Sequence, residues 1–302
     1  MHHIFVINPK AGRIDRTKEI EEKLHSYDGK ISYEIYVTKS LGDAQCFVRE
    51  YLSTHSKDET YRFYACGGDG TLYDVVNGSA GYPNVEVACV ASGSGNDFVK
   101  NFHNLEKFRD LDKEIAGTAK KIDLLKVGDK YCINIANYGF DGEVTFAQLK
   151  YKRRPFTTGP MAYKKAALHC LLFKMNQYLK LTIDDEVVFE GKGLLVALAN
   201  GYCYGGGYHC APEAIIDDGL MDVCLIKAVS RFKAASFMKI FRKGEHITSP
   251  KTKNIVIYKK GKKAVVESDH PVAYAVDGEV FTSDRIEVNL LPKAISFVVP
   301  ID

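Results

Sequence analysis

The chain has 302 residues and a mass of 33.7 kDa, and its 41 lysine and arginine residues nearly balance 38 aspartate and glutamate residues. A hydrophobic share of 46% is ordinary for a globular protein and excludes extended disorder. The eight cysteines form no CxxC pair, and no apolar stretch reaches the ~18 residues of a membrane span. The sequence therefore predicts a cytoplasmic protein of two domains, without a secretory signal or a disulfide framework.

The first 125 residues alternate between strand and helix patterns. Strands are expected at 4–8, 31–38, 61–66 and 85–91, and helices at 17–24, 43–53 and 71–77. Such alternation is typical of a mostly parallel, doubly wound sheet with helices on both faces. Ligands of these sheets bind outside the carboxyl ends of the strands. Residues 1–125 are therefore predicted to form a Rossmann-like, nucleotide-binding α/β domain.

The remainder is rich in short β segments separated by turn dipeptides such as Asp184-Asp185 and Asp277-Gly278. This spacing predicts an antiparallel β-sandwich over residues 126–293. Two helical insertions are expected in it, at about 159–178 and 231–243. The last predicted strand, 294–300, is expected to return to the first domain, which would then include residues 294–302.

The net charge of +3 conceals an asymmetry between the two parts. Residues 1–125 carry 16 basic and 19 acidic side chains, whereas residues 126–302 carry 25 and 19. Residues 144–183 contain eight lysines and arginines and no acid, and residues 227–263 contain twelve and a single acid, Glu245. A solvated basic face and a surface for a nucleotide, an anionic membrane or a nucleic acid both fit this pattern.

Gly67-Gly68-Asp69-Gly70-Thr71 lies at a predicted strand-to-helix junction. Glycines let backbone N–H groups approach a ligand closely, and the start of the following helix favours a phosphate. Asp69 would repel that phosphate unless a cation intervenes, which indicates Mg²⁺. A tight turn with an aspartate cap is the simpler alternative.

Two further loops end strands at the same expected edge of the sheet. Ser92-Gly93-Ser94-Gly95-Asn96-Asp97 combines glycines, hydroxyls and a second aspartate, and Asn8-Pro9-Lys10 offers a cation to a phosphate. The GxxxxGK[ST], GxGxxG, HExxH and GxSxG motifs are absent.

Two acidic turns lie in the second part. Asp277-Gly278-Glu279 would matter chemically only if this hairpin corner faces the glycine-rich loops. Asp217 and Asp218 precede Gly219, and they fit either a structural cation site or a solvated turn.

In their order along nearly the whole chain, these motifs resemble the diacylglycerol kinase catalytic domain family, which includes bacterial soluble lipid kinases and is related to the sphingosine kinases. Asn134–Val144, Asn200–Pro212, Asp217-Asp218-Gly219 and Asp277-Gly278-Glu279 also fit its pattern. The second motif departs from it, because the usual Pro-Leu-Gly-Thr-Gly reads Ala-Ser-Gly-Ser-Gly at residues 91–95. The resemblance implies an ATP- and Mg²⁺-dependent kinase that phosphorylates the hydroxyl of a lipid such as diacylglycerol.

The resemblance also implies roles for individual residues. ATP would be held by Asn8, Lys10, Gly67, Gly68, Gly70, Thr71, Gly93, Ser94, Gly95 and Asn96. Metal would be held by Asp69, Asp97, Asp217, Asp218 and Glu279. Asp277 is expected to be the general base, with Asp69 as the other candidate and Glu279 nearby.

The lipid acceptor offers an explanation for the basic segments. Residues 164–181 are apolar along one helical stripe (Ala167, Leu168, Leu171, Leu172, Met175, Leu179), which is surrounded by lysines. Such a helix can dock peripherally on an anionic membrane, and it can equally face the core. A homodimer is compatible with the sequence, and no nucleic-acid partner is expected. An NAD kinase-like enzyme and a non-catalytic nucleotide- or lipid-binding module remain as alternative functions.

Overall fold

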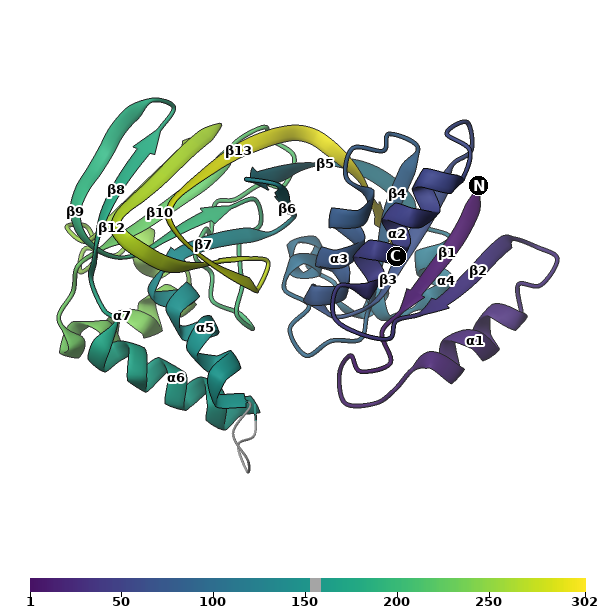
Figure 1. The fold of residues 1–302 in the computed structure, drawn as a ribbon, viewed down its shortest axis with the longest axis horizontal. Helices are drawn as coiled ribbons and strands as arrows, with labels where there is room; N and C mark the ends of the chain where they lie inside the picture. The colour runs from purple at the N-terminus through teal and green to yellow at the C-terminus, as the bar shows by residue number, and fades with distance from the viewer. Residues whose placement is uncertain (153–158) are drawn as a thin grey trace.

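The computed structural model describes residues 1–152 and 159–302, and it divides into two lobes (Figure 1). The first lobe comprises β1 (His2–Ile7), α1 (Thr17–His25), β2 (Ser32–Val37), α2 (Asp43–Thr54), β3 (Tyr61–Gly67), α3 (Asp69–Ser79), β4 (Val85–Ala91), η1 (Phe98–Phe102), η2 (Glu106–Arg109) and α4 (Leu111–Ile115). Strands β4, β3, β1 and β2 lie side by side in this order, and all neighbouring pairs are parallel.

The sheet of the first lobe is apolar on both faces, as a doubly wound sheet requires. Along β1, Ile4 and Val6 pack in one core with residues of α2 and α3. Phe5 and Ile7 point to the other face, where α1 and α4 cover them. Successive side chains of a strand alternate between faces, so both cores follow from one apolar run. The predicted α/β architecture is confirmed.

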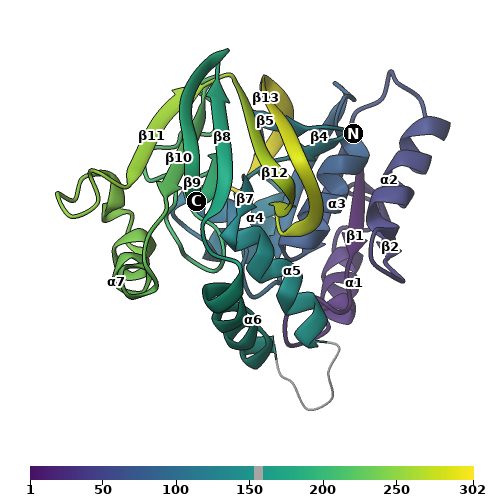
Figure 2. The same cartoon turned by 60° about the vertical axis from the view of Figure 1, so that its left-hand side comes forward.

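The second lobe is an antiparallel sandwich with three helices on its outer side. It comprises β5 (Thr118–Val127), β6 (Lys130–Cys132), β7 (Ile135–Gly139), α5 (Phe140–Lys152), α6 (Gly159–Phe173), β8 (Gln177–Ile183), β9 (Glu186–Ala199), β10 (Met221–Lys227), α7 (Arg231–Arg242), η3 (Glu245–Ile247), β11 (Val256–Gly261), β12 (Lys263–Val276) and β13 (Glu279–Val299). One core fills the sandwich, and a second lies between the sheet and helices α5, α6 and α7. Figures 1 and 2 show these helices below the strands.

Strand β13 connects the two lobes. Its first part, residues 279–289, pairs with β12 in the sandwich, and its second part, residues 288–299, pairs with β5. Near its end, Ser296 and Phe297 lie parallel to Glu86 and Val87 of β4. The final residues of the chain therefore extend the sheet of the first lobe (Figure 1).

The structure joins several strands that the sequence pattern separates. The sequence pattern indicates separate strands at 186–190 and 194–200, at 264–268 and 272–276, and at 285–290 and 294–300, and these pairs are joined in β9, β12 and β13. In β12 the interruption at Pro271 is a register shift between Glu267 and Val272, and pairing resumes beyond it. A bulge of this kind accommodates a proline without ending the strand.

The sequence pattern did not predict helix α5, and the predicted end of the helix that corresponds to α6 is wrong. α6 ends at Phe173, because Asn176 adopts a left-handed conformation and Gln177 begins β8. Leu179 is therefore a buried strand residue, and Met175 also lies beyond the helix, so the predicted stripe is wrong at these positions. The buried side of α6 consists of small residues, Ala162, Ala166 and Cys170. Leu168 and Leu172 point outward.

Arg153 and Arg154, which contribute to the first basic segment, lie outside the described residues. Among the residues that are described, no helix is both long and apolar enough to cross a membrane.

Candidate active site

Two cavities meet between the lobes. The loop cavity, about 670 Å³, is lined by the glycine-rich loops of the first lobe and by Glu279. The inner cavity, about 340 Å³, lies between the first lobe and helices α5, α6 and α7. Among the described residues, Asp69 is the one that lines both cavities.

The loop cavity collects most of the residues that were predicted to bind a nucleotide. Its lining includes Asn8, Lys10, Gly68, Gly70, Thr71, Gly93, Ser94 and Gly95. They follow β1, β3 and β4, whose carboxyl ends share one edge of the parallel sheet. Asp69 begins α3, so the N–H groups of the first turn of that helix are available to an anion at this edge.

Glycine is required where these loops touch each other. A Cβ atom on Gly93 would lie 2.4 Å from the Cα of Gly68, and a Cβ on Gly95 would lie 2.5 Å from Oδ2 of Asp69. The loops after β3 and β4 therefore approach more closely than any residue with a side chain allows.

Several predicted residues also hold the loops in place by hydrogen bonds or packing. The Asn8 side chain donates to Thr71 Oγ1 at 3.1 Å, which ties the first loop to α3. Asn96 binds both the N–H and the C=O of Gly93, at 3.1 and 2.7 Å, and so closes its own loop. Gly67 packs against the Thr71 side chain and does not line the cavity.

Asp69 and Asp97 lie close together at the junction of the cavities. The backbone N–H of Asp97 donates to Asp69 Oδ1 at 2.7 Å. Burial raises the pKa of Asp69, and the charge of Asp97 raises it further. The Asp97 carboxylate accepts from Lys100 Nζ at 2.5 Å and from the Gly206 N–H at 2.9 Å.

The Asp277 carboxylate is occupied by donors from a single loop. It accepts the backbone N–H groups of Ile133, Asn134 and Ile135 at 2.7–3.0 Å, and also the Cys132 thiol at 3.1 Å. Burial raises the pKa of Asp277 to about 6, while these donors act in the opposite direction. Asp277 therefore fixes the turn before β7 at the wall of the inner cavity.

The remaining acidic candidates separate into two places. Glu279 lines the loop cavity, whereas Asp277, two residues earlier in the chain, lines the inner cavity. Asp217 pairs with Lys120 at 2.8 Å and Asp218 with Lys260 at 3.3 Å, and neither lines a cavity described above. Within the described residues, no three histidine, cysteine, aspartate or glutamate side chains are grouped to hold a metal. The metal roles stay predictions.

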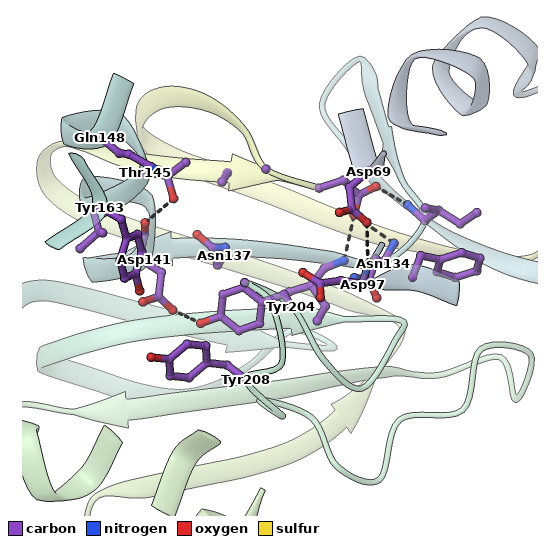
Figure 3. Close-up of a pocket in the computed structure, with 18 of the residues that line it drawn as sticks. Asp69, Asp97, Asn134, Asn137, Asp141, Thr145, Gln148, Tyr163, Tyr204 and Tyr208 are labelled. Atoms are coloured by element: carbon purple, nitrogen blue, oxygen red, sulfur yellow. Dashed lines mark hydrogen bonds between the residues drawn. The ribbon is translucent and has the colours of Figure 1, made fainter. Parts of the chain in front are cut away.

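Sequence reasoning missed most of the inner cavity. Its polar lining includes Asn137, Asp141, Thr145, Gln148, Tyr163, Tyr204 and Tyr208 (Figure 3). Asp74, in the loop cavity, was also missed; burial and the charge of Glu279 raise its pKa to about 6. Asn137 and Asp141 lie within the Asn134–Val144 motif, which was the available signal, but their side-chain directions depend on β7 and α5.

The chain matches two families of known domains. Residues 2–127 match the diacylglycerol kinase catalytic domain, and residues 134–299 match the YegS C-terminal NAD kinase beta sandwich-like domain. The first match covers the elements of the first lobe and β5, and the second runs from the turn before β7 to the end of β13.

Curated proteins match over most of their length. The chain is 30% identical over 278 residues to a diacylglycerol kinase of Staphylococcus aureus, covering 91% of this chain and 84% of that protein. It is 29% identical to the protein named "Probable lipid kinase YegS-like" of Shewanella frigidimarina, covering 96% and 91%. A crystal structure of a diacylglycerol kinase from Bacillus anthracis superposes with a TM-score of 0.71 at 19% identity, covering 98% of this chain and 96% of that one.

Proposed function

The chain belongs to the diacylglycerol kinase family and is a kinase, and on this premise we propose that it transfers the γ-phosphate of ATP to the hydroxyl of a lipid. The observation that carries the proposal is the meeting of the two cavities at Asp69. A phosphoryl donor and an acceptor can approach one carboxylate from opposite sides there. Phosphoryl transfer needs this positioning together with charge neutralisation.

ATP is assigned to the loop cavity. Its phosphates would face the backbone N–H groups around Gly68 and Gly93 and the first turn of α3, with the exposed Lys10 beside them. The cavity volume of about 670 Å³ lies within the range of roughly 300–1,000 Å³ that is usual for ligand sites.

The chemistry of the carboxylates fits Mg²⁺. Oδ2 of Asp69 and Oδ2 of Asp97 both lie near Gly95, where a Cβ would be 2.5 and 3.7 Å from them. Two carboxylates that repel each other are relieved by a cation, and Mg²⁺ in kinases uses one or two carboxylates together with substrate phosphates. Asp97 would hold the ion, with Asp69 and Glu279 nearby, and the ion would neutralise charge on the phosphates.

Asp69 is the proposed general base. The Asp277 carboxylate accepts from four donors at the wall of the inner cavity, whereas Asp69 lines both cavities and accepts from the backbone N–H groups of Asn96 and Asp97. As the lipid oxygen attacks the γ-phosphorus, its proton passes to Asp69, the bond to the β-phosphate oxygen breaks, and ADP leaves. Asp277 then acts as a positioning residue.

A transfer assay with labelled ATP tests the proposal on the full chain. The acceptors are diacylglycerol, monoacylglycerol, sphingosine, ceramide and NAD. Transfer to a lipid and not to NAD is expected, and it requires added Mg²⁺. Phosphorylation of NAD alone would favour the NAD kinase-like alternative. ATP binding without transfer to any acceptor would favour a non-catalytic module.

We also propose that the second lobe docks on an anionic membrane through α6 and the start of α7. Its docking patch consists of Leu168, Leu172, Phe173 and Phe232, which are 58%, 42%, 72% and 92% exposed. The Arg231 guanidinium donates to the carbonyls of Leu171 and Leu172, so the two helix ends are held together.

Charge supports this orientation. Lys164, Lys165 and Lys233 are exposed beside the patch, while several lysines of the second basic segment are already paired with acids, as Lys260 is with Asp222 at 3.1 Å. A lysine near an anionic surface contributes about 1 kcal/mol. The inner cavity is lined by Tyr163 of α6 and Met238 of α7, so the same helices would face the lipid supply.

Sedimentation with vesicles containing anionic lipid tests the patch. Phe232→Ser should reduce binding several-fold, and high salt should reduce it further. Ile14→Ser is the matched control, because Ile14 is 76% exposed on the first lobe. Equal binding of both variants, or a change of oligomeric mass on Phe232→Ser, would instead indicate that the patch does not meet lipid.

A further inference from the structure

The inner cavity has a polar end away from Asp69. Asp141, in the first turn of α5, and Tyr204, on the glycine-rich loop before β10, both line it. The Tyr204 hydroxyl donates to Asp141 Oδ2 (Figure 3). Burial raises the pKa of Asp141 to about 7, and no cation pairs with this carboxylate among the described residues. Its second oxygen is therefore available to a ligand.

A second polar side chain lies between the two ends. Asn137 of β7 is 5% exposed, and its amide oxygen has no hydrogen-bond partner in the described part of the chain. Figure 3 shows it between Asp141 and Asn134. A buried amide without a partner costs about 1–3 kcal/mol, so a ligand that bonds it recovers free energy.

The backbone holds both side chains in fixed positions. β7 is paired on both sides, with Asn137 opposite Ala197 of β9 and Ala275 of β12. The first turn of α5 packs directly on β12, since a Cβ on Gly142 would lie 2.3 Å from the Ala273 carbonyl oxygen. The loop that carries Tyr204 (the tyrosine loop) is tied to the end of the cavity near Asp69, because its Gly206 N–H donates to Asp97. Such preorganisation is what a specificity site needs.

We propose that Asn137, Asp141 and Tyr204 form a subsite for a second hydrogen-bond donor on the acceptor, next to the hydroxyl that is phosphorylated. The preferred acceptor is then an amphiphile with a free hydroxyl or N–H beside the reacting hydroxyl, such as a monoacylglycerol or a long-chain amino alcohol. This inference rests on the proposed lipid kinase function and sharpens its substrate class.

The hydrogen-bonding capacity of these side chains determines which acceptor fits the subsite. An ionised carboxylate only accepts, and the Tyr204 hydroxyl spends its proton on Asp141, so both present lone pairs to the cavity. Diacylglycerol has one free hydroxyl, and its remaining oxygens belong to esters, which also only accept. It would leave the second carboxylate oxygen of Asp141 without a donor. Sites built to bond a hydroxyl or N–H discriminate strongly against analogues that lack it.

The size of the cavity agrees with a small headgroup. At about 340 Å³ it lies at the lower end of ligand pockets, so it holds the polar head and the start of a chain rather than two long acyl chains.

The test compares kcat/KM of the full chain for diacylglycerol, monoacylglycerol and a long-chain amino alcohol in mixed micelles. It is run on the alkaline side of the Asp141 pKa of about 7, where the carboxylate is ionised. The wild type should prefer the two-donor acceptors. Asp141→Leu and Asn137→Ala should each reduce that preference about 10- to 100-fold, through a selective loss of kcat/KM for the two-donor acceptors. Tyr204→Phe, which removes only a hydroxyl, gives a milder change in the same direction.

Met238→Leu is the matched control, an apolar change of similar volume in the same cavity, and it should change all acceptors together. Preference of the wild type for diacylglycerol, or an equal loss for all acceptors in Asp141→Leu and Asn137→Ala, would overturn the subsite while lipid kinase activity stands. Absence of transfer to every lipid would overturn the proposed function itself, and the subsite with it.

Discussion

The loop cavity and the inner cavity lie side by side but are built differently. The loop cavity is made largely of backbone, with glycines of consecutive βα loops in contact, as at Gly68 and Gly93. The inner cavity is made of side chains from β7, α5, α6, α7 and the tyrosine loop. A site of the first kind suits a phosphate, which backbone N–H groups bind regardless of side chain. A site of the second kind suits an acceptor molecule that must be distinguished from similar molecules, because its side chains set which groups can be bonded.

The difference separates what is common to a kinase from what is particular to this chain. On the proposed function, substituting a loop glycine should weaken ATP binding, whereas changing Asn137 or Asp141 should alter which acceptor is preferred. Asp69 lines both cavities, so its substitution should reduce turnover for every acceptor alike.

The largest effect is expected for Asp69→Asn. If Asp69 accepts the proton of the acceptor, kcat should fall by ~10²–10⁴-fold for every lipid, with little change in the free energy of unfolding. Labelled-ATP turnover and urea unfolding measure the two quantities. Asp74→Asn, which changes a carboxylate of the loop cavity alone, is the control and should retain most turnover. Comparable turnover of Asp69→Asn and the wild type would remove Asp69 from the base role.

Asp277→Asn should act on the wall of the inner cavity. Replacing a carboxylate that accepts three backbone N–H groups and a thiol should cost about 2–3 kcal/mol of unfolding free energy. Urea unfolding measures it, with the exposed Asp284→Asn as control, expected within about 0.5 kcal/mol of the wild type. Unchanged stability with a ~10²–10⁴-fold loss of turnover would instead assign the base to Asp277.

Gly93→Ala should weaken the loop cavity and spare the inner one. Its Cβ would lie 2.4 Å from Gly68 Cα, so the loops must separate. An overpacking cost of about 1–3 kcal/mol corresponds to about 5- to 150-fold in ATP affinity, measurable by calorimetry. In Gly70→Ala the nearest atom is Glu279 Oε1 at 3.9 Å, so a smaller loss is expected. Equal losses would point to direct contact of both glycines with ATP.

The smallest effect concerns pH. The base must be ionised, so turnover should rise with pH through the Asp69 pKa, which burial and Asp97 place above that of an ordinary aspartate. Lys100 lowers this pKa by its charge. Lys100→Met should therefore move the acid limb of the pH–rate profile to higher pH. An unmoved limb, or one displaced to lower pH, would contradict the assignment of that limb to Asp69.

Local patterns in the sequence were sufficient to predict features that depend on the order of strands and helices along the chain. The strand–helix alternation of residues 1–125 predicted the parallel sheet, since both its faces are covered by neighbouring segments of the chain. The grouping of the glycine-rich loops was predictable because the carboxyl ends of parallel strands share one edge of the sheet. The patterns were misleading where distant partners decide: Gln177 pairs with Gly193 of β9, and this pairing ends the helical region early.

By itself, the sequence determined the two-lobe architecture, the three loops and the family. Only the tertiary structure showed that the Asp277 carboxylate is hydrogen-bonded by the loop at 132–135. It also showed that Asn137 and Asp141 share a cavity with Asp69. The physical reason is that a βα loop is specified by adjacent residues, whereas a side-chain cavity is specified by contacts among elements far apart in the chain. The small net charge likewise does not show which lysines pair with acids in the fold, as Lys260 does, and which remain exposed beside the docking patch, as Lys233 does.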